Sequence, residues 1–145
     1  IEIIEQSIIL YGQHDQTTIH FENTSGRDII VNADRDQILR CFNNLIKNAI
    51  EARSGDRHCI IDILLYRKPG SVCVEIKDNG IGIPEQEIDE IYYNFQRGSN
   101  SSKHRGSGIG LFIAKRVIKR LDGQINISSK INVGTEVRLF FPNQS

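Results

Sequence analysis

The sequence predicts a mixed α+β domain, a two-layer α/β sandwich in which helices cover one face of a mostly antiparallel sheet. Residues 34–52 and 109–121 carry apolar side chains at the 3.6-residue spacing of an amphipathic helix. Short strand patterns lie between and after them, and Val72–Asp78 alternates most cleanly between apolar and polar residues. The outer face of the sheet is expected to be polar. The 145 residues, 39% hydrophobic and 25% charged, suffice for a single globular domain over 1–145.

The N-terminal half is expected to hold two helices and two strands. A short helix ending near Tyr11 is predicted by the spacing of Ile1, Ile4, Ile8 and Ile9. Strands are expected at 17–21 and 29–31, joined by a turn at 23–26, and then a helix from about 34 to 52.

The C-terminal half is expected to alternate strands with two further helices. The elements in order are strands at 59–66 and 72–78, a short helix from Pro84 to about 92, a helix at 109–121, and strands at 124–129 and 135–141. Residues 96–108 form a polar stretch with nothing to bury. A loop of this length in a small domain is more often a lid or binding loop than a plain connection.

Charge and composition exclude several classes of function. The balance of 18 basic and 18 acidic side chains argues against a general nucleic-acid binder, which needs positive charge to displace counterions. Apolar runs fall far short of the ~20 residues that span a bilayer, so no direct membrane contact is expected. The first residues show no signal peptide, and because no initiator Met is present we expect a longer parent protein.

The three cysteines indicate neither a disulfide framework nor a zinc site. Cys41, Cys59 and Cys73 lie 18 and 14 residues apart, without the C-x-x-C spacing of metal sites. We expect them to be small residues of the core or sheet, in a reducing compartment.

Two amides on one line of the long helix form the first candidate for chemistry. Asn44 and Asn48 are separated by four residues and therefore project from the same side, with Glu51 close behind. Amide oxygens are neutral hard ligands that suit a magnesium ion sharing oxygens with a nucleotide phosphate. Two solvated Asn residues at the edge of the apolar stripe are the alternative.

The second candidate is the segment Asp78–Ile83, which follows the alternating strand. Its two glycines, Gly80 and Gly82, would let backbone approach a flat ligand, and a carboxylate at a strand end could accept from an exocyclic amine. A plain β-turn is the alternative, because Asp, Asn and Gly are turn residues.

The third candidate is Gly106–Leu111, which precedes an amphipathic helix. Backbone N–H groups at a helix start, freed of side chains by glycine, form an anion cradle. A dinucleotide-binding fold is rejected because no strand precedes these glycines and no βαβ unit surrounds them. Arg97, Lys103 and Arg105 flank the glycines and could reach phosphate oxygens, or could be solvated loop charges.

These pieces occur in an order that resembles the ATP-binding catalytic domain of bacterial sensor histidine kinases. That family belongs to the GHKL superfamily of Bergerat-fold proteins, with gyrase, Hsp90 and the mismatch-repair ATPases. The resemblance extends from about 17 to 142 and rests on five motifs. Asn44–Ala49 looks like the N box, Asp78–Ile83 the G1 box, Phe95 the F box, Gly106–Leu111 the G2 box and Gly134-Thr135 the G3 position.

The resemblance implies ATP and Mg²⁺ as cofactors and a role for each matching residue. Asn48 would be the principal metal ligand and Asn44 a second contact, while Asp78 would recognise adenine with help from Gly82 and Thr135. The lid would span 96–107, with Arg97 delivering the γ-phosphate, and residues 1–16 would be a helical lead-in. The full set implied to bind the nucleotide is Asn44, Asn48, Asp78, Gly80, Gly82, Ile83, Phe95, Arg97, Gly106, Gly108, Ile109, Gly110, Leu111 and Thr135.

Two departures from the family pattern bear on function. Glu51-Ala52-Arg53 stands where many members carry Lys, Tyr or His, which leaves open whether Arg53 reaches phosphate. The acceptor His in a helical hairpin is also missing, since His14-Asp15 precedes a strand.

Three functions are therefore compared: a kinase acting on a partner His, an ATP-hydrolysing clamp, and a nucleotide-binding module without chemistry. The clamp enzymes place a Glu four residues before the metal-binding Asn, where this chain has Asn44, and an amide cannot accept a proton from water. The kinase is favoured. Its expected partners are a dimerisation and phosphoacceptor hairpin of the same parent and a response-regulator receiver domain. The expected location is the cytoplasmic side of a parent anchored in the inner membrane.

Overall fold

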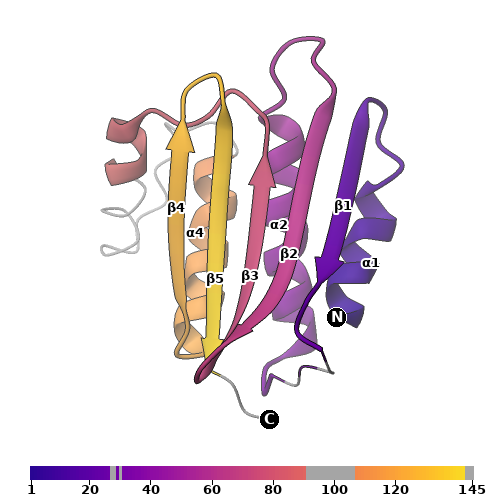
Figure 1. Ribbon diagram of the computed structural model, residues 1–145. Coiled ribbons are helices and arrows are strands. Elements are labelled where there is room, and N and C mark those ends of the chain that lie inside the picture. Colours follow the sequence, from indigo (N-terminus) through magenta and orange to yellow (C-terminus); the bar gives the residue numbers. More distant parts are fainter. Residues whose placement is uncertain (27–28, 30, 91–106, 143–145) are drawn as a thin grey trace.

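The computed structural model describes residues 1–26, 29, 31–90 and 107–142. Three helices and five strands have defined bounds, and residues 85–90 add a short helix (Figure 1). In chain order the elements are α1 (Glu2–Tyr11), β1 (Thr17–Asn23), α2 (Arg35–Glu51), β2 (Cys59–Lys68), β3 (Ser71–Asp78), α4 (Ser107–Arg120), β4 (Gln124–Lys130) and β5 (Gly134–Pro142).

The five strands form one mixed sheet in the order β1-β2-β3-β5-β4. β1 runs parallel to β2, and the other three pairs of neighbours are antiparallel. Figure 1 shows α1, α2 and α4 on the same side of this sheet, behind it in that view. The predicted α+β class, with helices on one face of a mostly antiparallel sheet, is confirmed.

The long helix α2 forms because its sequence supplies both a cap and an apolar stripe. The Asp34 side chain accepts hydrogen bonds from the backbone N–H groups of Asp36 (2.9 Å) and Gln37 (3.3 Å), which would otherwise lack partners. The stripe that faces the sheet and α4 consists of Ile38, Cys41, Phe42, Leu45, Ile46 and Ala49.

The core lies between the helices and the inner face of the sheet. Ile46 on α2, Ile118 on α4 and Leu139 on β5 have no exposed surface. Cys41, Cys59 and Cys73 are free thiols and buried, as predicted. Burial raises the pKa of Cys41 to about 12, so this thiol stays protonated and unreactive at neutral pH.

The first prediction concerns the contribution of the core to stability. Ile46→Ala should reduce the free energy of unfolding by about 2–5 kcal/mol, because it removes fully buried methyl groups and leaves a cavity. Ile9→Ala is the matched control, since the same side chain on α1 is 74% exposed and its loss should cost about 0.5 kcal/mol or less. Urea unfolding followed by circular dichroism measures both, and equal destabilisation by the two variants would contradict the assigned core.

Two details of the N-terminal prediction are wrong. Ile29 and Val31 lie outside any strand, and β1 pairs with β2 rather than forming a hairpin with this segment. Both residues contribute to an apolar cavity between α1, the start of α2 and the sheet, so they are half-buried without strand pairing. Ile9 was expected on the packed side of the first helix, but Ile4 and Ser7 are the buried residues there.

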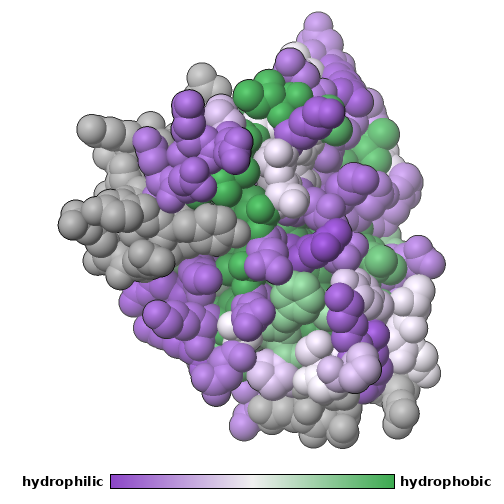
Figure 2. Space-filling view, turned by 60° about the vertical axis from the view of Figure 1, so that its left-hand side comes forward, coloured by the Kyte–Doolittle hydropathy of each residue, from purple (hydrophilic) through white to green (hydrophobic). Residues whose placement is uncertain are grey.

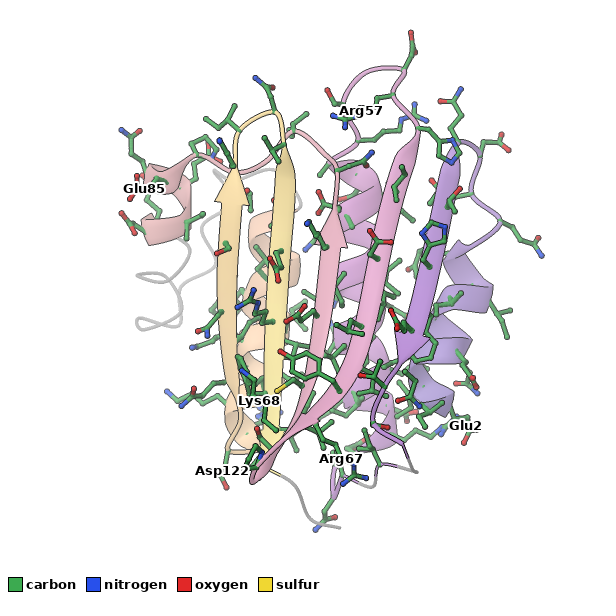
Figure 3. All side chains as sticks on the ribbon, in the orientation of Figure 1. Glu2, Arg57, Arg67, Lys68, Glu85 and Asp122 are labelled. Atoms are coloured by element: carbon green, nitrogen blue, oxygen red, sulfur yellow. The ribbon has the colours of Figure 1, made fainter. Side chains whose placement is uncertain are left out.

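The outer face of the sheet is largely polar, as expected (Figure 3). Arg138 lies 3.4 Å from Glu75 and 2.8 Å from Glu136, and the Lys68 ammonium lies over the rings of Tyr66 and Phe140. None of the described helices is long and apolar enough to cross a membrane.

Candidate functional site

A cavity of about 440 Å³ lies where β3 and α2 end, at the upper end of the sheet in Figure 1. Four parts of the chain meet there: the second half of α2, the segment after β3, the start of α4, and the β4–β5 turn with the start of β5. The residues that line it are Leu45, Asn48, Ala49, Glu51, Ala52, Ile76, Asp78, Ile81, Gly82, Ile83, Pro84, Glu87, Leu111, Ile131, Asn132, Thr135 and Val137.

Asp78 is a buried carboxylate, 8% exposed, in the wall of this cavity. Its Oδ1 accepts hydrogen bonds from the backbone N–H groups of Gly80 (2.9 Å) and Thr135 (3.3 Å). Among the described residues no group donates to Oδ2. The carboxylate is therefore oriented by the backbone, and one of its oxygens is left to accept from a ligand.

The electrostatic state of Asp78 follows from the same contacts. Burial raises the pKa of this carboxyl above its usual 3.8, and the two N–H bonds oppose that shift without cancelling it. The folded state therefore binds the Asp78 proton more readily than the unfolded state. This contribution to stability is present at acidic pH and is lost as the pH rises from 3.8 through the raised pKa.

Asp78→Asn should accordingly make the empty protein more stable at neutral pH. The amide oxygen can still accept from Gly80 and Thr135, while the cost of burying a charge is removed. The difference in melting temperature between variant and wild type should shrink as the pH is lowered towards 3.8. Calorimetric melts across that range test it, and a variant less stable than wild type at neutral pH would show that the charge itself stabilises the fold.

The glycines after Asp78 are required by the loop's contacts with other backbone. Gly82 has φ +75°, and a Cβ there would collide with the carbonyl group of Lys130; a Cβ at Gly80 would collide with that of Ala52. The Ile81 N–H donates to the Ala52 carbonyl at 2.8 Å. Space for a flat ligand was the predicted reason for these glycines, but close packing against α2 and the β4–β5 turn already requires them. Gly82 and Ile83 do line the cavity, and Gly80 does not.

The predicted amide pair lies on α2, and its two members differ in position. Asn48 lines the cavity, whereas Asn44, one turn earlier, does not. The Nδ2 atom of Asn44 is buried and has no hydrogen-bond partner in the described part of the chain. An orphaned buried amide indicates a missing partner, such as a phosphate oxygen or, with the amide turned over, a metal ion.

A resident metal would depend on these amides and the nucleotide rather than on a protein cage. In the described ranges, no three His, Cys, Asp or Glu side chains come together as a metal site. Magnesium commonly takes one or two protein ligands plus substrate phosphates and water, which fits Asn48 with Asn44 nearby.

The structure describes only part of the segment that is predicted to bind the phosphates. Gly108, Ile109 and Gly110 lie in the first turns of α4, which begins at Ser107, two residues before the predicted start at about 109, and Leu111 lines the cavity. Phe95, Arg97, Gly106 and residues 96–106 of the expected lid lie outside the described residues. Arg53 does not line the cavity, and it donates to the Gln16 side chain at 2.7 Å.

Sequence reasoning missed Glu87 and Ser129 at or beside this site, and it placed Glu51 beside the amide pair without giving it a role. Glu51 and Glu87 line the cavity, and the Ser129 hydroxyl contacts the Thr135 hydroxyl at 2.8 Å. Ser129 could have been found, because it continues the inward-facing series of Ile125 and Ile127 on β4, where a polar residue needs a reason.

Comparison with known proteins agrees with the interpretation of this cavity as a nucleotide site. Residues 33–145 match the family model described as histidine kinase-, DNA gyrase B-, and HSP90-like ATPase. Sporulation kinase A of Bacillus subtilis is 32% identical over 141 residues, which is 97% of this chain and 22% of that protein. Sensor histidine kinase WalK of Bacillus subtilis is 28% identical, over 88% of this chain and 21% of that protein.

Solved structures agree with the sequence relatives. The catalytic domain of histidine kinase ThkA, in a nucleotide-free form, superposes with a TM-score of 0.80 at 27% identity, covering 98% of this chain and 91% of that one. The chain belongs to the histidine kinase-, DNA gyrase B-, and HSP90-like ATPase family. WalK and ThkA are named as histidine kinases, and the chain spans about a fifth of the length of the two curated relatives named above.

Proposed function

We propose that this chain is the ATP-binding catalytic domain of a two-component sensor histidine kinase. It would transfer the γ-phosphoryl group of ATP to a His on a separate dimerisation hairpin of the same parent. The observation that carries the proposal is the oriented Asp78 carboxylate, in one cavity with Asn48 of α2. An acceptor for an amine at one side and an amide ligand at the other fit the two ends of a nucleotide.

The proposed roles divide along the cavity. Asp78 would accept a hydrogen bond from the adenine amine through Oδ2, while Asn48 and Asn44 would hold the metal ion beside the phosphates. Magnesium would supply charge neutralisation to those phosphates. The backbone N–H groups at the start of α4, from Gly106 to Gly110, would bind phosphate oxygens with support from the helix dipole. Phe95 and Arg97 belong to the proposed lid at 96–107, which closes over the nucleotide.

In phosphoryl transfer, this domain would align the nucleotide with its acceptor and stabilise the charge of the transition state. The partner would supply the nucleophile. A bond forms between the partner's imidazole nitrogen and the γ-phosphorus, and the bond from phosphorus to the bridging oxygen breaks, so ADP leaves. The imidazole proton passes to a base on the partner. Asn44 stands where clamp ATPases place their Glu, which disfavours attack by water. Glu51 and Glu87 line the cavity and are the carboxylates whose removal distinguishes the two reactions.

The proposed partners follow from this assignment. They are the dimerisation and phosphoacceptor hairpin, to which residues 1–16 would lead, and the receiver domain of a response regulator. The domain would work on the cytoplasmic side of a parent anchored in the inner membrane. The names of two relatives, a sporulation kinase and a sensor histidine kinase, support the assignment to a signalling kinase.

Magnesium-dependent nucleotide binding tests the proposal. Titration calorimetry with a non-hydrolysable ATP analogue should show binding that weakens when magnesium is chelated. Asn48→Ala should lower the affinity by about tenfold or more, about 1.4 kcal/mol, only when magnesium is present. Asn126→Ala is the control, because Asn126 is exposed on β4, away from the cavity. Binding that ignores both magnesium and Asn48 would contradict the metal assignment.

A further inference from the structure

We propose that Ser129 is a positioning residue that makes the Thr135 hydroxyl a hydrogen-bond acceptor and thereby helps the cavity select a base with an amino group. The inference rests on the proposed function and adds a specificity determinant to it. Ser129 does not line the cavity, whereas Thr135 does, so Ser129 acts through its neighbour.

The Ser129 hydroxyl lies at the centre of three contacts. It accepts from the Ile83 N–H at 2.7 Å, donates to the Gly134 carbonyl at 3.0 Å, and lies 2.8 Å from the Thr135 hydroxyl. Ser129 and Thr135 are direct partners across the β4–β5 ladder, which holds the two hydroxyls together. The network ties the loop after Asp78 to the last two strands.

The number of protons determines the direction of the third contact. A serine hydroxyl has one proton and two lone pairs. The Ile83 N–H can only donate and the Gly134 carbonyl can only accept, so Ser129 uses one lone pair and its single proton on them. With that proton given to the Gly134 carbonyl, the Thr135 contact uses the remaining lone pair, and we assign Thr135 as the donor to Ser129. The Thr135 oxygen is left with lone pairs and no proton for a ligand.

The Thr135 hydroxyl oxygen is therefore a second hydrogen-bond acceptor beside the Asp78 carboxylate. The two residues are joined through the Thr135 N–H to Oδ1 bond at 3.3 Å, and both line the cavity. A carboxylate and a hydroxyl that only accepts present two acceptors to the base. Such a pair favours an amino group, which donates two hydrogen bonds, over a carbonyl, which would place lone pairs against lone pairs.

The network lies at the end of β4, next to an exposed turn. Beyond Ser129, the β4–β5 turn exposes Ile131 and Val133, 54% and 55%. Figure 2 shows hydrophobic surface near the upper end of the view, at the height of this turn, amid hydrophilic surface. Ser129 is the last inward-facing residue of β4 before that turn, and it reaches the cavity only through its contact with Thr135.

The experiment compares ATP with inosine triphosphate, in which a carbonyl replaces the amino group, using non-hydrolysable analogues and calorimetry. Wild type should prefer ATP, and Ser129→Ala should reduce the ratio of the two affinities by roughly three- to tenfold. Thr135 could then turn its proton towards the base and accommodate the carbonyl. Ser128→Ala, on the opposite, exposed face of β4, is the matched control and should leave the ratio unchanged.

Two further variants separate positioning from stability. In a Thr135→Val background, Ser129→Ala should have no additional effect on the ratio, because the hydroxyl through which it acts is gone. Ser129→Thr, which keeps a hydroxyl, should restore the preference.

The possible failures are distinguishable. A lower melting temperature with equal losses for both nucleotides would reduce Ser129 to a structural role and overturn this inference while leaving ATP binding intact. Failure of wild type to bind either nucleotide would overturn the proposed function as well.

Discussion

Asp78→Asn is expected to lower the affinity for ATP by about tenfold or more. The substitution keeps the shape of the side chain, but it can place an N–H₂ group where the adenine amine needs an acceptor. A mismatched buried hydrogen bond costs about 1–3 kcal/mol, which is about a tenfold to hundredfold change in the dissociation constant. We expect the variant to remain folded. The raised pKa of Asp78 reflects the cost of burying its charge, and an asparagine carries no charge. Loss of binding would therefore report recognition rather than unfolding.

Calorimetric titration with ATP and GTP makes the measurement. Wild type should bind ATP well above GTP, and Asp78→Asn should remove most of that difference. Asp62→Asn is the matched control, since Asp62 is exposed on β2 and pairs with His20 at 3.0 Å, outside the cavity. Equal binding of the two nucleotides by wild type would rule out adenine recognition by Asp78.

The parts of the fold that could be predicted are those encoded locally. The apolar spacing of α2 and the alternation of β3 each depend on neighbouring residues, and the structure confirms both. The partner of a strand depends on residues far along the chain, and the sequence pattern carries no such information. The parallel pairing of β1 with β2 was therefore missed, and a short apolar run at 29–31 was taken for a strand.

The same division applies to the site. Asp78 and Asn48 could be singled out from the sequence. Asp78 ends an alternating strand, and Asn48 lies four residues after Asn44 on one side of a helix. The structure brings Asp78 and Asn48 to one cavity. Glu51 was placed only as a neighbour of the amide pair, and Glu87 was not found, because an exposed acidic side chain has no pattern that reveals which way it faces. Gly82 was predicted at the right place for an incomplete reason, since its contact with Lys130 exists only once the β4–β5 turn has folded against the loop.

The largest expected effect concerns phosphoryl transfer, which this chain alone should not complete. None of its described histidines lies in a helix: His14 is in the turn between α1 and β1, His20 pairs with Asp62, and His58 contacts Thr18 at 2.6 Å. An acceptor needs a free imidazole that can approach the γ-phosphate. We therefore expect ATP binding without self-phosphorylation, and no useful rate of ATP hydrolysis because Asn44 cannot serve as a base for water.

Adding a helical-hairpin partner that bears an acceptor His should start the reaction, because the partner contributes the nucleophile and its assisting acidic residue. Incubation with γ-labelled ATP should place acid-labile label on the hairpin, and a hairpin with His→Gln should stay unlabelled. Asn48→Ala should abolish transfer if Asn48 is, as proposed, a ligand of the metal ion, whereas Asn126→Ala should not change it. Label on this chain alone would mean that one of its own histidines is the acceptor. Rapid phosphate release without a partner, lost in Glu51→Gln or Glu87→Gln, would instead identify a carboxylate base in the cavity and assign the chain to the ATP-hydrolysing branch of its family.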